Sequence, residues 1–348
     1  LLSRPPKLEA DLSDMNDDLA VLMFTAGTTG TPKAVMLTHE SFASYILANV
    51  EPVDPEITES NLLTVPLYHI AGLQAVIAGI YAGRTLIVQR QFEPQEWMTL
   101  IQEFRVQRAM MVPTMLKQIM EQPNFSSFDL SSLEIITYGA APMPLEIIRR
   151  AIDEFPGCRF INAFGQTETA STITMLAPED HEIPVGLPRS EQEIRLRRLT
   201  SIGKPLPDVQ VRIVDDFGAD VAHEQIGELV ARGPRLMKGY WNQAEATQAA
   251  IRSGWLYTGD LGYSDADGYI YLAGRAKDTI KRGGEMISPE EVENVLRSHV
   301  AVDDAAVIGI PDAEWGETVR AIVTIRSEHT QPDPGELIEY CRERLASF

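Results

Sequence analysis

Between Leu19 and about Met175 the sequence alternates short apolar runs with longer amphipathic segments. The apolar runs have the length and composition of strands, and they are LAVLMF, NLLTVPL, RTLIVQ, RAMMVP, LEIITYG and RFINAFG. The amphipathic segments indicate helices near residues 40–50, 71–82, 94–104, 113–121 and 144–155. Because strand–helix alternation with few hairpin signals is typical of parallel sheets covered by helices, the pattern predicts a doubly wound α/β layer with a largely parallel sheet.

The pattern changes at Ile202, where strands begin to alternate with turns instead of helices. Segments such as VQVRIVDDFG, GELVARG and GYIYLAG continue to Leu272 and predict a small antiparallel β unit. A third region, of α+β type, begins at Arg275 with the strand-like VDDAAVIGI and RAIVTIRS and the helical PEEVENVLRSH. The expected domains are a large one at 1–273, with an α/β part at 19–175 and a β part at 202–272, and a small one at 274–348.

Composition restricts the class of partner. A formal net charge of −20 argues against nucleic acid, whose phosphates require a basic face, although local basic groups can still bind an anionic small molecule. The longest apolar run, IAGLQAVIAGIYAG, is too short and too rich in glycine to span a bilayer. The two cysteines, Cys158 and Cys341, lie in dissimilar contexts, and no targeting segment is visible. These features favour a reducing cytoplasm.

The stretch MFTAGTTGTPKAVMLTH, from Met23 to His39, joins a strand-like run to a loop of glycines and threonines that ends at Lys33. Such a loop presents backbone N–H groups and hydroxyls that suit phosphate oxygens, and the lysine adds a positive charge. It is not a Walker A loop, because Pro32 precedes the lysine where that motif requires glycine. On its own the stretch also fits a surface turn between two strands. We expect it to meet GAAP and GQTE beyond the carboxyl ends of the parallel strands.

Read in order, seven motifs resemble those of the acyl-adenylate-forming superfamily, and they are TAGTTGTPKAV, VPLYH, GAAP, NAFGQTET, GELVARG, YTGDLG and GRAKDTIKRGGEMISPEEVE. This superfamily contains acyl-CoA synthetases, luciferases and the adenylation domains of peptide synthetases. The resemblance covers nearly the whole chain, from Leu19 to Phe348, and is closest to acyl-CoA synthetases and fatty acid–CoA ligases. It implies that a carboxylic acid attacks the α-phosphorus of ATP to give acyl-AMP and pyrophosphate, after which a thiol displaces AMP.

The resemblance also implies which residues bind the nucleotide. Thr25, Thr28, Thr29 and Lys33 would contact the β- and γ-phosphates, and Thr167 would hold the α-phosphate. Glu168 would bind Mg²⁺, which prefers oxygen ligands. The full implied set for the nucleotide is Thr25, Gly27, Thr28, Thr29, Gly30, Lys33, Gly139, Ala140, Ala141, Asn162, Phe164, Gly165, Gln166, Thr167, Asp260 and Arg275.

Three of these assignments have simpler alternatives. Asp260 would accept both ribose hydroxyls, with Arg275 reaching the ribose or the phosphates, but Thr-Gly-Asp is also a common turn. Phe164 would lie against adenine, where the family usually has tyrosine, but an aromatic side chain can equally be part of the core. The Thr167–Glu168 pair after a strand also fits an ordinary helix N-terminus.

The implied catalytic residues are His69, Lys33, Thr167, Glu168, Lys277 and Lys281. In acyl- and aryl-CoA ligases the histidine at the position of His69 lies between the acid pocket and the phosphates, although a lone histidine is often structural. Lys277 would sit at the hinge on which the small domain swings between adenylating and thiolating poses. Lys281 would face the active site in the second pose, although two lysines four residues apart can also form a solvated face.

The chain departs from the family pattern in two ways. Ala26 stands where serine or glycine is usual, and Ala34 where glycine is usual, but both are small enough to keep the path of the loop. The sequence stops at CRERLASF, before the distal Gly-Lys motif of the family, and begins close to the Gly/Thr loop. We therefore expect the chain to be truncated at both ends.

These features together predict a Mg·ATP-dependent carboxylic acid–CoA ligase whose small-molecule substrates are an acid, ATP and CoA. Small and apolar residues near 71–80 and 169–175 suggest an apolar pocket, which favours a fatty or aryl acid. An amino-acid-activating domain fits less well, because VPLYHIAGL has no aspartate to pair with an α-amine. Two alternatives stay open, an acyl-AMP ligase that loads a carrier-protein thiol and a catalytically silent nucleotide-binding module. The sequence does not indicate an oligomeric state.

Overall fold

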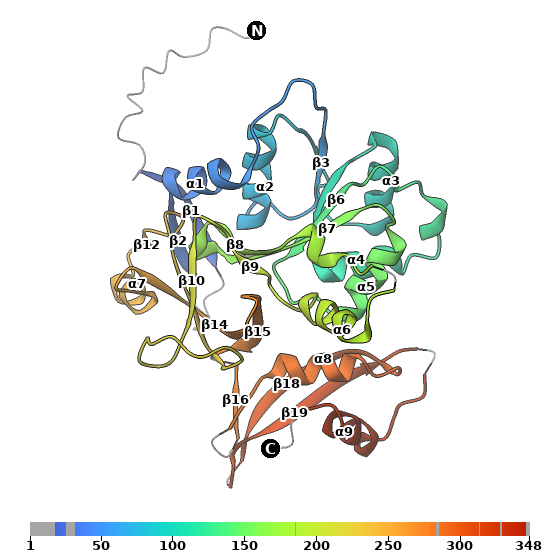
Figure 1. Cartoon of the computed structure of the whole chain (residues 1–348), viewed down its shortest axis with the longest axis vertical. Coiled ribbons are helices and arrows are strands. Elements are labelled where there is room, and N and C mark those ends of the chain that lie inside the picture. The colour runs from blue at the N-terminus through green and yellow to red at the C-terminus, as the bar shows by residue number, and fades with distance from the viewer. Residues whose placement is uncertain are drawn as a thin grey trace.

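The computed structural model describes residues 18–25, 32–184, 186–276, 278–282, 285–312, 314–327 and 329–345, with the backbone alone at Glu285 and Met286. Four sheets are formed within these ranges. Sheets of seven, three and five strands make up the larger part of the molecule, and a sheet of four strands with two helices forms the smaller C-terminal part (Figure 1).

The seven-stranded sheet has the order β4-β3-β5-β6-β7-β8-β9. Its parallel strands are β3 (Ser60–Leu63), β4 (Thr85–Val88), β5 (Arg108–Met111), β6 (Ile135–Gly139) and β7 (Arg159–Gln166), and its antiparallel strands are β8 (Ser171–Leu176) and β9 (Lys204–Pro205). The helices around it are α2 (Ile70–Tyr81), α3 (Pro94–Phe104), α4 (Pro113–Met120), α5 (Leu145–Glu154) and α6 (Arg189–Arg198). The predicted doubly wound, largely parallel sheet is therefore confirmed.

The largest apolar core lies between this sheet and helices α3, α4 and α5. The helices contribute residues spaced one turn apart, such as Trp97 and Ile101 of α3, and the sheet contributes alternate residues of its strands, such as Ile136 and Tyr138 of β6. All four side chains are fully buried. Because the strand order reverses after β4, right-handed crossovers place α2 on the opposite face of the sheet from α3, α4 and α5.

We expected the Gly/Thr loop to follow a strand of the parallel sheet, and this prediction was wrong. The loop joins β1 (Leu19–Thr25) to β2 (Lys33–Thr38), which pair antiparallel with Thr25 opposite Lys33 in a separate sheet completed by β12 (Gly239–Tyr240). The physical reason is loop length, because a parallel crossover needs a dozen or more residues and the two strands are only seven apart. The residues of the loop from 26 to 31 lie outside the described ranges. Strand β2 leads into α1 (His39–Asn49), whose first turn is capped by Thr38 and Ser41.

The predicted antiparallel β unit is confirmed by five strands, which are β10 (Gln210–Val214), β11 (Gly227–Arg232), β13 (Ile251–Arg252), β14 (Trp255–Ser264) and β15 (Ile270–Arg275). The short helix α7 (Ala244–Ala250) precedes β13. The register of β14 against β15 places Asp260 directly opposite Arg275, and it shifts between Asp260 and Gly262. This bulge sets which face of the sheet the two side chains share.

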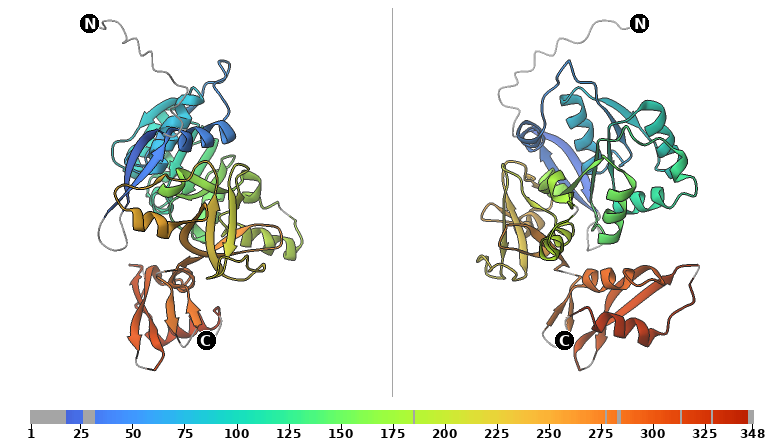
Figure 2. Two further views of the ribbon diagram at one scale, coloured as in Figure 1. Left: turned by 90° about the vertical axis from the view of Figure 1, so that its left-hand side faces the viewer. Right: turned by 45° about the vertical axis from the view of Figure 1, so that its right-hand side comes forward.

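The C-terminal part contains β16 (Ile280–Arg282), β17 (Glu285–Ile287), β18 (Val302–Asp312) and β19 (Gly316–Ile325) in the order β17-β16-β19-β18. Helices α8 (Pro289–Arg297) and α9 (Pro334–Arg342) pack on this sheet around Ile280, Leu296, Val302 and Leu337. Figures 1 and 2 show that α8 lies on the side that faces the larger part. Among the helices of the described ranges, none is long and apolar enough to cross a membrane.

Candidate active site

Two neighbouring cavities lie where the sheets meet. The smaller has a volume of about 330 Å³ and lies within the larger part of the molecule. The other has a volume of about 740 Å³ and lies between the larger part and the C-terminal part. Arg275 lines both cavities, and the adjacent Ala140 and Ala141 of the GAAP turn line one each. The GAAP turn and Arg275 therefore mark the boundary between them.

The smaller cavity brings together motifs that are up to 250 residues apart in the sequence. Nine of its lining residues were predicted for the site, and they are Thr25, Lys33, His69, Ala140, Gly165, Gln166, Thr167, Glu168 and Arg275. Five others were not, and they are Ile70, Tyr240, Leu256, Tyr257 and Thr258. Although the strands that flank the Gly/Thr loop belong to a different sheet from the one expected, their ends at Thr25 and Lys33 line this cavity.

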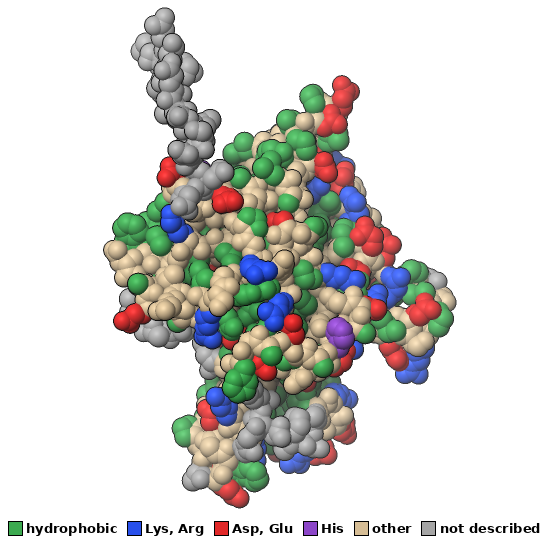
Figure 3. Space-filling view, turned by 60° about the vertical axis from the view of Figure 1, so that its left-hand side comes forward, with side chains coloured by type: hydrophobic (Ala, Val, Ile, Leu, Met, Phe, Trp, Pro, Cys, Tyr) green, Lys and Arg blue, Asp and Glu red, His purple; other side chains and the backbone are tan. Residues whose placement is uncertain are grey.

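Most of the charged side chains that line this cavity are positive, whereas the net charge of the whole chain is negative. Its lining includes the cations Lys33 and Arg275 and, among the described residues, one carboxylate, that of Glu168. The chain as a whole carries a formal charge of −20. Figure 3 shows that basic side chains also lie near the middle of one face of the molecule. The cavity is therefore locally suited to an anionic ligand within an acidic protein.

Lys33 and Glu168 meet through Tyr240, which the sequence analysis missed. The Tyr240 hydroxyl donates a hydrogen bond to Oε1 of Glu168 at 3.0 Å, and the Lys33 Nζ lies 4.6 Å from the centroid of the tyrosine ring. Burial, with a further contribution from Glu168, raises the pKa of Tyr240 above its usual range, so the phenol stays protonated. The signal that could have found this residue in the sequence is the Gly-Tyr pair of MKGYW. The structure shows why a glycine stands there, because Gly239 has a φ of 145°, which other residues rarely adopt.

The GQTE motif forms a sharp reversal between β7 and β8. A Cβ atom at Gly165 would lie 1.8 Å from the carbonyl oxygen of Ser171, so the two strands can approach only because this residue is glycine. A 3₁₀ turn, Thr167–Thr169, follows, and Ala170 and Ser171 then have φ values of 49° and 105°. This strained turn places Thr167 and Glu168 on the wall of the cavity, as functional sites often require.

Asp260 is held by donors from two directions. Its Oδ1 lies 2.7 Å from Nε of Arg275, and its Oδ2 accepts a hydrogen bond of 2.6 Å from Nε2 of Gln166. The same Gln166 nitrogen donates to the carbonyl of Thr258 at 2.9 Å. The Asp260 side chain is 6% exposed, whereas that of Arg275 is 49% exposed. The carboxylate is therefore fixed in direction, and its role with ribose stays a prediction.

His69 is the N-cap of α2. Its Nδ1 accepts a hydrogen bond from the backbone N–H of Ala71 at 3.2 Å, which leaves the proton of the neutral ring on Nε2. Neighbouring groups desolvate the ring enough to lower its pKa, although the residue keeps access to solvent through the cavity. At neutral pH the side chain is therefore a neutral hydrogen-bond donor.

Several predicted residues lie away from this cavity. Gly139 is required by strand packing, because a Cβ atom there would lie 2.2 Å from the carbonyl oxygen of Ala163. Asn162 donates to the carbonyl of Ser201 at 3.2 Å, and Phe164 packs against the apolar clusters around Ile173 and Ile202. These contacts match the structural alternative for Phe164, and the adenine contact of Phe164 stays a prediction.

Neither Lys277, assigned to the hinge, nor Lys281, assigned to the thiolating pose, is among the described residues that line the smaller cavity. Lys277 lies outside the described residues, as do Gly27, Thr28, Thr29 and Gly30 of the Gly/Thr loop. Lys281 is an exposed residue of β16, where its backbone N–H donates to Oε2 of Glu317 at 2.6 Å. Its exposure agrees with the alternative of a solvated face, and its role in the thiolating pose stays a prediction.

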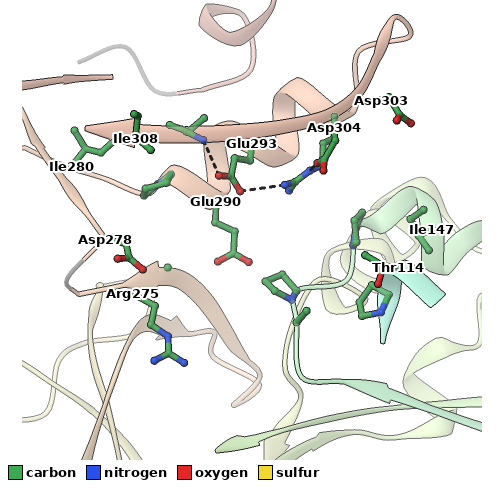
Figure 4. Close-up of a pocket in the computed structure, with 18 of the residues that line it drawn as sticks. Thr114, Ile147, Arg275, Asp278, Ile280, Glu290, Glu293, Asp303, Asp304 and Ile308 are labelled. Atoms are coloured by element: carbon green, nitrogen blue, oxygen red, sulfur yellow. Dashed lines mark hydrogen bonds and ion pairs between the residues drawn. The ribbon is translucent and has the colours of Figure 1, made fainter. Parts of the chain in front are cut away.

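The larger cavity is lined on one side by α4 and the GAAP turn and on the other by α8 and β18 (Figure 4). Glu290, in the first turn of α8, points into it. Burial raises the pKa of Glu290 to about 7, and the nearby Glu293 adds to this effect, whereas Arg297 opposes it. Glu293 itself accepts hydrogen bonds from the N–H of Val307 and from Arg297. The sequence analysis did not single out Glu290, because its burial arises only where the two parts meet.

Comparison with known proteins gives the same result as the motifs. A family model described as AMP-binding enzyme matches residues 4–241, and one described as AMP-binding enzyme C-terminal domain matches residues 291–348. A feruloyl-CoA synthase from Amycolatopsis sp is 35% identical over 345 residues, which cover 99% of this chain and 66% of that protein. A medium/long-chain-fatty-acid–CoA ligase from Mycobacterium tuberculosis is 38% identical over 333 residues, which cover 94% of this chain and 55% of that protein.

The fold agrees as well. The o-succinylbenzoate coenzyme A synthetase from Bacillus subtilis, solved in complex with ATP and magnesium ion, matches with a TM-score of 0.81 and 34% identity, over 95% of this chain and 64% of that one. The chain thus spans at most about two thirds of the length of these relatives. The expected resemblance is confirmed over nearly all of the described sequence, and the chain belongs to the AMP-binding enzyme family.

Proposed function

We propose that this chain activates a carboxylic acid with ATP and transfers the acyl group to a thiol, as an AMP-forming acid–CoA ligase. The observation that carries the proposal is the convergence of Lys33, Glu168 and Arg275 with His69 in one cavity of a chain that belongs to the AMP-binding enzyme family. Two cations and one carboxylate form a suitable lining for a triphosphate with its metal ion.

The fit of Mg²⁺ follows from the donor set. No group of three or more histidine, cysteine, aspartate or glutamate residues that could hold a metal is present in the described part of the chain. Mg²⁺ usually keeps several waters and binds through one or two carboxylates together with substrate phosphates, so the single carboxylate of Glu168 is sufficient. When bound there, Mg²⁺ would neutralise phosphate charge.

The residues of the chain would act in two steps. In the first, an oxygen of the substrate carboxylate attacks the α-phosphorus of ATP, and pyrophosphate leaves. Lys33 and Arg275 stabilise the phosphate charge, Thr167 holds the α-phosphate, and the neutral His69 donates a hydrogen bond beside the reacting oxygens. In the second, the thiolate of CoA attacks the acyl carbon, the carbon–oxygen bond to AMP breaks, and AMP leaves.

We further infer a two-domain organisation, with a large domain at 1–273 and a small one at 274–348. The support is topological, because among the residues that the structure describes no sheet contains strands from both sides of the segment between β15 and β16. That segment contains Lys277, which we assign to the hinge, and it precedes Lys281, which we assign to the thiolating pose. The substrate we propose is a fatty or aryl acid, because α2, which contributes Ile70 to the smaller cavity, consists mostly of apolar and small residues.

The test is exchange of labelled pyrophosphate into ATP by the chain, with a panel of fatty, aryl and amino acids. We expect exchange that depends on a fatty or aryl acid and on Mg²⁺, and AMP release when CoA is added. Release with a phosphopantetheinyl carrier protein but not with CoA would replace CoA as the acceptor. ATP binding without exchange on any acid would contradict the proposal and favour a silent nucleotide-binding module.

A further inference from the structure

Tyr240 is fixed in place in the smaller cavity by contacts of its backbone and of the residues around it. Its backbone N–H donates to Oγ1 of Thr247 at 2.9 Å, and β12 pairs it with Val35 of β2. On either side, the N–H of Lys238 and that of Trp241 donate to carbonyls of β2. The residue is 7% exposed, yet it lines the cavity. The ring therefore has a defined position and little freedom to move.

This fixed ring touches both opposite charges that the proposed function uses. Its hydroxyl donates to Oε1 of Glu168, and its face lies under the ammonium of Lys33. The aromatic face attracts the cation through its quadrupole, while the phenol O–H gives the carboxylate a charge-assisted hydrogen bond. Oε1 of Glu168 is thereby occupied, whereas no hydrogen bond reaches Oε2 from the residues that the structure describes. Oε2 is the oxygen left for a ligand.

The hydroxyl is what separates this arrangement from simple packing. Tyr240 belongs to the apolar cluster with Val35, Leu37 and Phe42, and a phenylalanine would fill the same space. Within the described residues, the hydroxyl of Tyr240 makes its hydrogen bond to Glu168. The backbone of Glu168 is held independently, because its carbonyl accepts from the N–H of Met237. Removal of the hydroxyl should therefore free the carboxylate without displacing the turn that carries it.

We propose that Tyr240 is a positioning residue that directs the Glu168 carboxylate toward Mg²⁺ and steadies the Lys33 ammonium for the phosphates. The inference rests on the proposed function, since it assumes that nucleotide and metal bind in the smaller cavity. Groups that orient a metal ligand commonly change metal affinity by about 10- to 100-fold when they are removed. The two contacts of Tyr240 are separable, because Tyr240→Phe removes the hydroxyl alone and Tyr240→Leu removes the ring as well.

The experiment is a pair of equilibrium titrations by calorimetry. In the first, Mg²⁺ is titrated into each variant saturated with a non-hydrolysable ATP analogue, and in the second the analogue is titrated without metal. For Tyr240→Phe we expect Mg²⁺ affinity to fall about tenfold and metal-free nucleotide affinity to stay within about twofold. For Tyr240→Leu we expect both to fall, because Lys33 loses its support. Tyr257→Phe is the matched control, since Tyr257 lines the same cavity and makes no hydrogen bond to Glu168 in the described structure.

A double-mutant cycle with Glu168→Gln separates orientation from a general structural effect. If Tyr240 acts through Glu168, the Phe substitution should have no further effect on Mg²⁺ affinity once the carboxylate is gone. Equal Mg²⁺ affinities of the wild type and Tyr240→Phe, or additive losses in the cycle, would overturn the inference. Failure of the wild type to bind the analogue would instead overturn the proposed function itself, so the two failures are distinguishable.

Discussion

The two cavities differ in how their charged groups are balanced. In the smaller one, each charge that lines or borders it has a defined neighbour, since Tyr240 contacts Lys33 and Glu168, and Arg275 pairs with Asp260. In the larger one, Glu290 makes no hydrogen bond or ion pair within the described residues, and its pKa is raised to about 7. The first cavity is organised within one part of the molecule, whereas the second exists only while two parts lie together. We therefore propose that the first cavity binds the ligand and that the second responds to the position of the C-terminal part.

The largest expected effect comes from removing one lysine from each cavity and comparing the two losses. Lys33→Ala should weaken ATP binding by about 10- to 150-fold, because a hydrogen bond to a charged group contributes about 1.5–3 kcal/mol. Lys117→Ala, in the wall of the larger cavity, is the control and should leave ATP affinity unchanged. ATP affinity and Tm are measured together. Equal effects of the two substitutions would remove the distinction between the cavities, and unchanged affinity in Lys33→Ala would remove that residue from the site.

The second prediction concerns the carboxylate at the boundary. Asp260→Ala should weaken ATP binding by about tenfold and abolish the preference for ATP over 2′-deoxy-ATP, because no neighbour in TGDLG can accept the ribose hydroxyls in its place. Binding of both nucleotides to wild type and variant is the measurement. A variant that still prefers ATP over the deoxy form would show that Asp260 serves only its partners Arg275 and Gln166.

The third prediction uses pH to change the charge of Glu290 in the larger cavity. The folded pKa of Glu290 is about 7, above its ordinary value of 4.5, so the folded state binds more protons between these values. The contribution of the protonated Glu290 side chain to the free energy of unfolding is therefore fully present below pH 4.5, and it is lost as pH rises through 7. Relative to wild type, Glu290→Gln should be more stable by about 2 kcal/mol at pH 8 and equally stable at pH 4.5, after allowance for the remaining solvent contact.

Unfolding by denaturant at both pH values measures this difference. A pH-independent difference between Glu290→Gln and wild type would mean that the carboxyl is not desolvated at the junction. Glu291→Gln, one residue along the same helix turn, is the matched control and should not alter the pH dependence.

The smallest effect is expected at the ion pair that links the two parts. Lys117 Nζ lies 2.9 Å from Oδ1 of Asp303, but their side chains are 30% and 50% exposed. Exposed pairs of this kind contribute about 0.2–1 kcal/mol, and salt screens them. Asp303→Asn should therefore lower the unfolding free energy by no more than that amount, and the difference should vanish at about 1 M salt. A larger loss that persists in high salt would mean that this contact fixes the position of the C-terminal part.

Local sequence patterns predicted six of the helices, because the signals that start and stop a helix lie at its own ends, but they missed α6, α7 and α9. Helix α3, for example, has the predicted bounds 94–104, with Glu93 capping its first turn, Pro94 at its first position and Arg105 in the left-handed conformation after it. The same patterns assigned β1 to the wrong sheet, because its true sheet includes β12, which follows about 200 residues later. The loop length between β1 and β2 was the overlooked signal.

The candidate site was predictable where a motif itself sits on the cavity wall, as with His69 and Glu168. It was not predictable where a role comes from packing between distant segments. Tyr240 reaches Glu168 across a separation of 72 residues, and Glu290 becomes buried only because α8 lies over the GAAP turn. The motif that contains Phe164 was recognised in the sequence. The structure adds apolar contacts of this side chain, and the sequence alone could not show whether it packs in the core or contacts adenine.

The most direct test is a crystal structure of the chain with ATP and Mg²⁺. The account predicts the triphosphate in the smaller cavity, within hydrogen-bond distance of Lys33 and Arg275, with the metal ion bound to the Glu168 oxygen that Tyr240 leaves open. A triphosphate bound instead in the larger cavity, between Lys117 and Arg297, with the smaller cavity holding only water, would contradict it.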